Sequence, residues 1–229
     1  MSKLMGIPAL AVAALAALAL TGCGKDENNP VAPVTSARVM AVHASPDAPA
    51  VDLLVDGAVA GTGLAFPNYT AYLTVPSGSR NLKVRVSGTT TDVIDANLPV
   101  GAGVNYSVFA VDVVANIGPL VLTDDLAAPA SGKTHVRFIH LSPDAPAVDV
   151  AVQGGPVLFA NRAFKQSTAF TPVDAGTYDL EVRLAGTTTV VLPLNGIALQ
   201  PGRIYTVFAK GLASGSGAQA LGAQIIANN

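Results

Sequence analysis

The chain has 229 residues, of which 50% are hydrophobic and only 12% are charged, and its formal net charge at pH 7 is −2. These values argue against a disordered chain, which needs low hydrophobicity and high net charge, and against nucleic-acid binding, which needs clustered lysine and arginine. An aromatic content of 5% without tryptophan supplies little for a flat surface that stacks bases or sugars. We therefore expect a folded chain that is rich in turns, because glycine (22) and proline (16) are frequent.

The first 22 residues predict an export signal. Lys3 precedes an apolar run, Ile7–Leu20, which is shorter than the roughly 20 residues of a membrane-spanning helix. The run ends in the tetrapeptide Leu20, Thr21, Gly22 and Cys23. This tetrapeptide resembles the bacterial lipobox, and the resemblance implies that Cys23 becomes a diacylglyceryl cysteine, with palmitate a typical acyl chain, at the start of the mature protein. Because Cys23 is the only cysteine, no disulfide is expected.

Residues 23–35 predict the lipidated cysteine and a flexible tether, because the segment is polar, then interrupted by proline, and has no periodicity. Gly24 stands where a signal for retention in the inner membrane usually places aspartate. By resemblance to enterobacterial sorting, this favours the outer membrane over the inner membrane. We therefore expect an exported protein that is anchored to the cell envelope through its lipid.

The mature chain contains an internal repeat. The segment His43–Asp52 (HASPDAPAVD) returns 97 residues later as His140–Asp149 (HLSPDAPAVD), with nine of ten residues identical. A period near 98 residues has the size of a complete domain. The Pro-, Gly- and Ser-containing segment 128–133 then predicts a linker between two domains, 36–127 and 134–229. The sequence leaves open whether the two domains pack together, and it leaves the oligomeric state open.

Alternating apolar and polar residues predict strands in both copies. In the segment Asn81–Ser87, Leu82 and Val84 share one face and Lys83 lies on the other. Six further strands are expected in the first copy: Arg38–His43, Val51–Val55 with a turn at Asp56-Gly57, Ala71–Val75, Val93–Leu98, Asn105–Val111 and Leu120–Thr123. Seven short strands per copy predict an all-β fold, with two tandem antiparallel β-sandwich domains of immunoglobulin-like size.

The repeated motif resembles the signature of a bacterial family known only as domain of unknown function 4397, whose members commonly occur as tandem copies in exported proteins. The resemblance extends over Ser36–Leu126 and Thr134–Asn229 and includes the later Gly-x-x-Tyr segments that end at Tyr106 and Tyr205. It implies the fold and carries no established activity.

The motif also supplies the candidate site residues, which belong to structural or binding loops: His43, Ser45, Asp47, Asp52, His140, Ser142, Asp144 and Asp149. Strand parity points both histidines toward the core. We expect each imidazole to bond to the following Ser-Pro-Asp turn, whose aspartate also caps backbone amides. One alternative is a calcium site built from the two aspartates of each motif, although calcium usually takes six or more oxygen ligands. Another is a Ser-His-Asp triad, which a spacing within five residues disfavours. We predict no metal, no cofactor and no catalytic residue.

Two functional hypotheses follow from these features. The leading one is a non-enzymatic structural or protein-interaction module of the cell envelope, with an envelope or extracellular protein as its partner. The alternative is a surface module that binds a small ligand or a glycan. It would require Phe66, Tyr69 and Tyr72 to form a concave cluster with polar neighbours.

Overall fold

The computed structural model describes residues 35–229, and these residues belong to one compact unit. The predicted signal peptide (1–22), the lipobox with Cys23, and the tether up to residue 34 lie outside the described residues. Within 35–229, no helix has the length and apolar character needed to cross a membrane. The helical elements in this range are the three-residue 3-10 turns Val114–Asn116 and Gly217–Gln219.

The first domain is built from eight strands. They are β1 (Ser36–His43), β2 (Val51–Val55), β3 (Ala58–Leu64), β4 (Leu73–Pro76), β5 (Gly78–Val86), β6 (Asp92–Val100), β7 (Asn105–Val111) and β8 (Gly118–Asp124). They form two four-stranded sheets in the orders β4-β1-β7-β8 and β3-β2-β5-β6. Asp56 and Gly57 join β2 to β3, and both have positive φ (49° and 80°), as the favoured two-residue hairpin turn requires.

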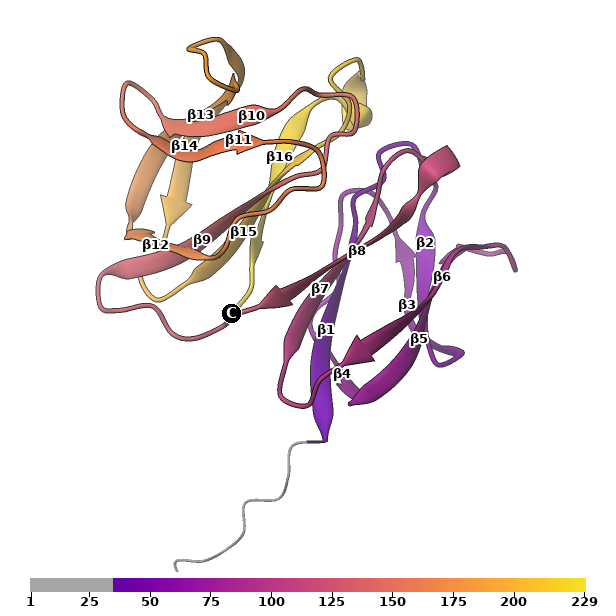
Figure 1. Cartoon of the computed structure of the whole chain (residues 1–229). Helices are drawn as coiled ribbons and strands as arrows, with labels where there is room; N and C mark the ends of the chain where they lie inside the picture. Colours follow the sequence, from indigo (N-terminus) through magenta and orange to yellow (C-terminus); the bar gives the residue numbers. More distant parts are fainter. Residues whose placement is uncertain (1–34) are drawn as a thin grey trace, which may run out of the picture. The chain divides into compact units, whose positions relative to one another are not determined.

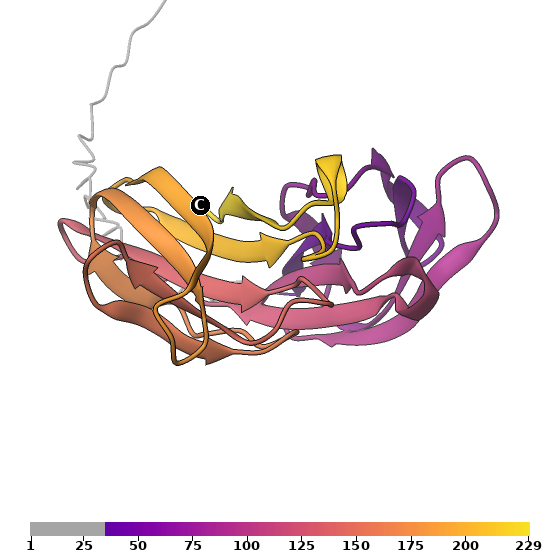
Figure 2. The same ribbon diagram turned by 90° about the horizontal axis from the view of Figure 1, so that it is seen from above.

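The second domain repeats this arrangement. Its strands are β9 (Lys133–His140), β10 (Val148–Val152), β11 (Val157–Arg162), β12 (Thr171–Asp174), β13 (Gly176–Leu184), β14 (Val190–Leu199), β15 (Ile204–Lys210) and β16 (Gly222–Ala227). The sheet orders are β12-β9-β15-β16 and β11-β10-β13-β14, the counterparts of those in the first domain. The two sheets of this domain are seen as separate layers in Figure 1, where β10, β11, β13 and β14 lie apart from β9, β12 and β15, and again in the turned view of Figure 2. The prediction of two β-sandwich domains is confirmed.

Each domain has one strand more than the seven expected. The additional strand is β3 in the first copy and β11 in the second, and each is an edge strand that pairs only with its hairpin partner. The sequence of β3, AVAGTGL, consists mostly of small residues, and all seven are half-buried or exposed. An edge strand of this composition shows little alternation of apolar and polar residues, so the sequence pattern does not predict it.

Each domain also contains one parallel strand pair within an otherwise antiparallel fold. β1 runs parallel to β7, from Arg38 opposite Asn105 to His43 opposite Ala110. β9 and β15 form the equivalent pair in the second domain. These two pairs depart from the expected antiparallel arrangement, because alternation reports which face of a strand is buried and carries no information about the direction of its neighbour.

Three apolar clusters stabilise the structure, and one of them belongs to both domains. One lies between the sheets of the second domain and one between those of the first. The shared cluster consists of Met40, Val42, Ala44, Phe109, Val111, Ile139, Leu141, Phe208 and Ile226. Phe109 and Phe208, which occupy equivalent positions in the two copies, meet edge to face with ring centroids 5.9 Å apart. The two domains therefore pack together, which the sequence had left open.

The shared cluster explains the burial of β1 on both faces. Val39 belongs to the cluster between the sheets of the first domain, whereas Met40 and Val42 belong to the cluster shared with the second domain. As a result, every residue from Val39 to His43 is buried. A continuous apolar run of this kind is typical of strands that are covered on both sides.

Candidate functional site

The repeated motif forms the loop after the first strand of each domain, and its histidine braces that loop. His43 is the last residue of β1 and is 1% exposed. Its Nε2 lies 3.0 Å from the carbonyl oxygen of Pro49, and Nε2 of His140 lies 3.0 Å from that of Pro146. A carbonyl can only accept a hydrogen bond, so Nε2 carries the proton in both imidazoles.

Burial also determines the charge of these two histidines. Desolvation lowers the pKa of His43 and of His140 below its ordinary value, and the bond to the proline carbonyl acts in the opposite direction. Both rings are therefore neutral at neutral pH. In the second domain, the bare Nδ1 of His140 accepts a hydrogen bond from the backbone N–H of Ser142 at 3.4 Å. In the first domain, Nδ1 of His43 and Oγ of Ser45 are buried and have no hydrogen-bond partner among residues 35–229.

The expected bond from the histidine to its own Ser-Pro-Asp turn is thus found only in the second copy. The bond that both copies share reaches the second proline of the loop, six residues after the histidine. The histidine therefore holds the two ends of a proline-stiffened loop together. This is a structural role of the kind that the sequence favoured, with a different partner atom.

The first aspartate of each motif fastens a second loop to the first. Oδ1 of Asp47 accepts the backbone N–H of Val114 at 2.7 Å, in the segment after β7. Asp144 accepts the backbone N–H of Ala213 at 2.6 Å and both the N–H and the hydroxyl of Ser214, at 3.0 and 2.7 Å, after β15. These aspartates cap backbone amides, as the sequence predicted, but the amides belong to a segment nearly 70 residues away.

The second aspartate of each motif joins the edge strand to a turn. Oδ1 of Asp52 accepts the N–H of Gly63 at 2.8 Å and the hydroxyl of Ser87 at 2.6 Å. The hydrogen bond from Ser87 lowers the pKa of Asp52, and the bond from Gly63 adds to that effect. Asp149 accepts the N–H of Asn161 at 2.6 Å and that of Gly186 at 2.9 Å. These contacts tie β3 or β11 to the turn that follows β5 or β13.

The histidine and the two aspartates of each motif therefore form hydrogen bonds within their own domain. A Ser-His-Asp relay needs the aspartate to orient the imidazole, whereas Asp47 bonds to Val114 and Nε2 of His43 bonds to Pro49. Across residues 35–229, no group of three or more His, Cys, Asp or Glu side chains is placed to hold a metal ion. The arrangement can stiffen loops, and it offers no aligned nucleophile and base.

A buried ion pair that the sequence reasoning missed connects the two domains. Nη1 of Arg137, on β9, lies 2.7 Å from Oδ1 of Asp124, the last residue of β8, and the two side chains are 2% and 0% exposed. Nε of Arg137 donates to Oγ1 of Thr206 at 2.9 Å, and Nη2 donates to Oγ of Ser107 at 3.1 Å. Desolvation lowers the pKa of Arg137, and the charge of Asp124 acts against that effect. The buried charge is thus paired and hydrogen-bonded, as its position requires.

Two more side chains extend this polar network. The hydroxyl of Tyr72 donates to Oδ2 of Asp124 at 2.5 Å and accepts a hydrogen bond from Nδ2 of Asn228 at 3.0 Å. Oδ1 of Asn228 in turn accepts the hydroxyl of Thr206 at 2.8 Å. Burial raises the pKa of Tyr72, and the Asp124 carboxylate raises it further. The network therefore draws polar groups from both domains into one hydrogen-bonded set.

One signal in the sequence could have revealed this network. In the parallel strand pairs, Arg137 lies opposite Thr206 in the second copy, and Met40 lies opposite Ser107 in the first. Thr206 and Ser107 are equivalent residues, so Arg137 occupies the position that Met40 has in the first copy. An arginine at an otherwise apolar strand position needs a buried partner. The partner lies in the other domain, and for that reason no pattern within one copy points to it.

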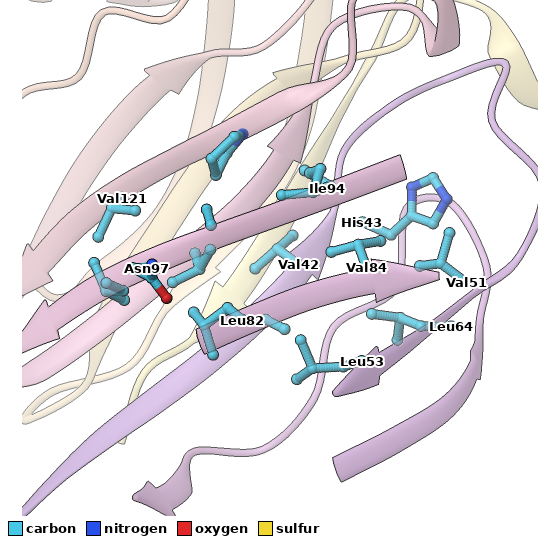
Figure 3. A pocket seen from close by; sticks show the side chains of 16 residues that line it. Val42, His43, Val51, Leu53, Leu64, Leu82, Val84, Ile94, Asn97 and Val121 are labelled. Carbon is cyan, nitrogen blue, oxygen red and sulfur yellow. The ribbon is translucent and has the colours of Figure 1, made fainter. Parts of the chain in front are cut away.

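The sheets of each domain also enclose an apolar cavity. The first-domain cavity has a volume of about 130 Å³ and is lined from both sheets. Figure 3 shows His43 at one end of its lining, beside Val51 and Val84, with Asn97 and Val121 toward the other end. The second-domain cavity has a volume of about 280 Å³, and its lining residues are apolar except Asp174 and Tyr178.

The three aromatic residues considered for glycan binding have separate roles. Phe66 lies edge-on to the ring of His43, with centroids 6.3 Å apart. Tyr69 forms an isolated bridge with Val42, and the hydroxyl of Tyr72 belongs to the inter-domain network. These contacts give no support to a shared sugar-binding surface.

Fold and site together define a class of protein: a tandem β-sandwich whose repeated loops are braced from within and whose domains share a buried interface. The sequence profile of the family described as Domain of unknown function (DUF4397) matches residues 37–151 and 147–229. The chain therefore belongs to this family, and the resemblance seen in the repeated motif is confirmed. The first match continues through the predicted linker into β10. No curated protein matches the chain.

Proposed function

We propose that this protein is a non-enzymatic, lipid-anchored module of the cell envelope that presents its two domains to a protein partner as one rigid body. The observation that carries the rigid body is the buried contact between Arg137 and Asp124, together with the apolar cluster formed by both domains. Domains that meet through a small polar interface move relative to each other by default. A shared apolar core with a buried ion pair opposes such motion.

The anchor is supported by the lipobox-like tetrapeptide that ends in the only cysteine of the chain, directly after an apolar run. Two or more acyl chains are enough for stable membrane attachment. Gly24 after the cysteine supports the outer membrane as the destination. A non-enzymatic role is supported by the histidine and the two aspartates of each motif, which hydrogen-bond to groups of their own domain.

The anchor is tested by the substitution Cys23→Ser in cells grown with labelled palmitate. We expect the unaltered protein to carry the label and to sediment with the outer-membrane fraction, and the variant to lose both properties. A control substitution, Ser2→Ala, keeps the lipobox-like tetrapeptide and should change neither. Label on the Cys23→Ser variant, or no label on the unaltered protein, would overturn the proposed anchor.

A second candidate function is the binding of a small ligand, and the apolar cavities between the sheets favour it. Ligand sites are commonly apolar hollows with a few polar groups at defined places. The second-domain cavity fits this description better, because its volume is larger and because Asp174 and Tyr178 contribute to its lining.

A further inference from the structure

The second-domain cavity lies between two sheets whose facing side chains do not fill the space. Its volume is about 280 Å³. An apolar cavity of about 150 Å³ stays dry and binds benzene. The second-domain cavity is thus large enough for an apolar group larger than benzene, and its lining excludes a ligand that must bury charge.

One wall of this cavity reaches the surface. Leu158, on the edge strand β11, lines the cavity and is 37% exposed, and Val157 beside it is 45% exposed. Phe138 and Phe159, on opposite sheets, stack with ring centroids 6.4 Å apart and contribute to the lining. An alkyl chain could therefore enter past an edge strand and lie against aromatic and aliphatic side chains.

The polar groups of the cavity belong to the segment around β12 and β13. The hydroxyl of Tyr178 donates to the backbone carbonyl of Asp174 at 2.8 Å. The carboxylate of Asp174 lies 2.7 Å from Nζ of Lys133, and these two side chains are 75% and 41% exposed. An exposed pair of this kind contributes little to stability. Lys133 lies outside the lining, next to the lining residue Asp174, and can exchange this exposed partner for a ligand carboxylate.

The first domain lacks these groups. The strand pairing places Ser36 and Pro76 at the positions that Lys133 and Asp174 have in the second domain. Arg80 stands at the position of Tyr178. Its cavity is also less than half as large. The two copies thus share a fold but differ at this end of the sandwich, so the first domain serves as an internal control for the second.

We propose that the second-domain cavity binds the alkyl chain of a single-chain fatty acid, with the carboxylate of the ligand facing Lys133. This goes beyond the interaction role proposed above and does not depend on the anchor at Cys23.

The test uses residues 24–229, which contain the whole described unit, and dodecanoic acid as the probe, with binding measured by displacement of a fluorescent fatty acid. We expect one probe per protein. Val207→Phe fills the second-domain cavity and should weaken binding by about tenfold or more. Val108→Phe makes the same change at the equivalent position of the first-domain cavity and should leave the affinity within about twofold. Circular dichroism verifies the fold of both variants.

A substitution at the surface tests the same proposal if Val207→Phe or Val108→Phe does not fold. Lys133→Ala alters an exposed side chain. We expect it to weaken binding of dodecanoate about twofold to fivefold and to leave binding of the uncharged dodecanol unchanged. Absence of dodecanoate binding by the unaltered protein, or equal loss in Val207→Phe and Val108→Phe, would overturn the proposal.

The source of the alkyl chain is distinguished with the full-length, lipidated protein. If the cavity takes a free fatty acid, the lipidated protein and residues 24–229 bind the probe equally. If it takes an acyl chain of the anchor, the lipidated protein binds no probe while residues 24–229 do. The first result supports the proposal. The second would overturn the fatty acid as the ligand, because an acyl chain of the anchor has no free carboxylate. A failure of the Cys23→Ser test leaves the binding experiment on residues 24–229 unaffected, so the two proposals fail separately.

Discussion

The guanidinium of Arg137, in the second domain, lies 2.7 Å from the carboxylate of Asp124, in the first, and water reaches neither side chain to a significant extent. Arg137 occupies the position of Met40 in the other copy, and Asp124 occupies the position of Asn228. The two copies have therefore diverged at their common interface so that one supplies the cation and the other the anion. This asymmetry makes the pair specific for the association of the first domain with the second.

The ion pair can be tested with Arg137→Met, which introduces the residue of the first copy. We expect a loss of about 3–5 kcal/mol in the free energy of unfolding, because the substitution leaves the buried Asp124 without its partner. Urea unfolding of residues 24–229 measures the change. Arg80→Met removes a more exposed ion pair with Asp56 and should cost less than about 1 kcal/mol.

A second substitution sharpens this prediction. Asp124→Asn introduces the residue found at the equivalent position of the second copy. When it is added to Arg137→Met, the double variant should recover much of the stability that Arg137→Met loses. Equal unfolding free energies for Arg137→Met and Arg80→Met would show that the buried ion pair contributes no more to stability than the exposed one.

The loop histidines provide a separate prediction on stability. Replacing both His43 and His140 by alanine removes two buried hydrogen bonds, to Pro49 and to Pro146. We expect a loss of about 1–3 kcal/mol for each site in urea unfolding. His135→Ala, at a half-buried position on β9, is the matched control and should have a smaller effect. A double variant as stable as the control would contradict the bracing role.

The same histidines predict how stability depends on pH. Their pKa in the folded protein is lowered from 6.5, mainly by desolvation, so the unfolded chain takes up protons more readily than the folded one. Stability from these groups is therefore fully present above the unfolded pKa and is lost as pH falls below it. We expect the free energy of unfolding to decrease between about pH 7.5 and 5.5.

The assignment to His43 and His140 is checked by substituting both with glutamine, which should flatten the pH dependence in this interval. The variant His135→Gln should retain it. A free energy of unfolding that rises toward acidic pH in the unaltered protein would refute the neutral, desolvated state of the two rings.

Calcium removal should leave the protein unchanged. The carboxylates of Asp52 and Asp149 each accept two hydrogen bonds from their own domain, and calcium usually requires about six or more oxygen ligands. We expect the same melting temperature with and without a chelator, measured by circular dichroism. If the chelator lowered the melting temperature and added calcium restored it, the motif would have to be interpreted as a calcium site.

Much of the fold was predictable because its information is local. The alternation of Leu82 and Val84 with Lys83 reports a half-buried strand, and the Asp56-Gly57 turn follows from the positive φ that a tight hairpin needs. The edge strand β3 escaped prediction, since none of its residues is buried and its sequence shows no regular alternation of apolar and polar residues. The partner of the first aspartate of each motif also escaped, because it lies far along the chain, as Val114 does from Asp47.

The sequence by itself determined that the described chain folds as two copies of one β-rich unit, and it determined where the bracing loops lie, because repeats, alternation and turn residues act over a few neighbours. Only the tertiary structure decided that β1 runs parallel to β7, that Arg137 pairs with Asp124 across the domains, and that the second sandwich encloses the larger cavity. Each of these depends on which surfaces meet in space, and residues separated by long stretches of chain carry no local pattern that records their contact.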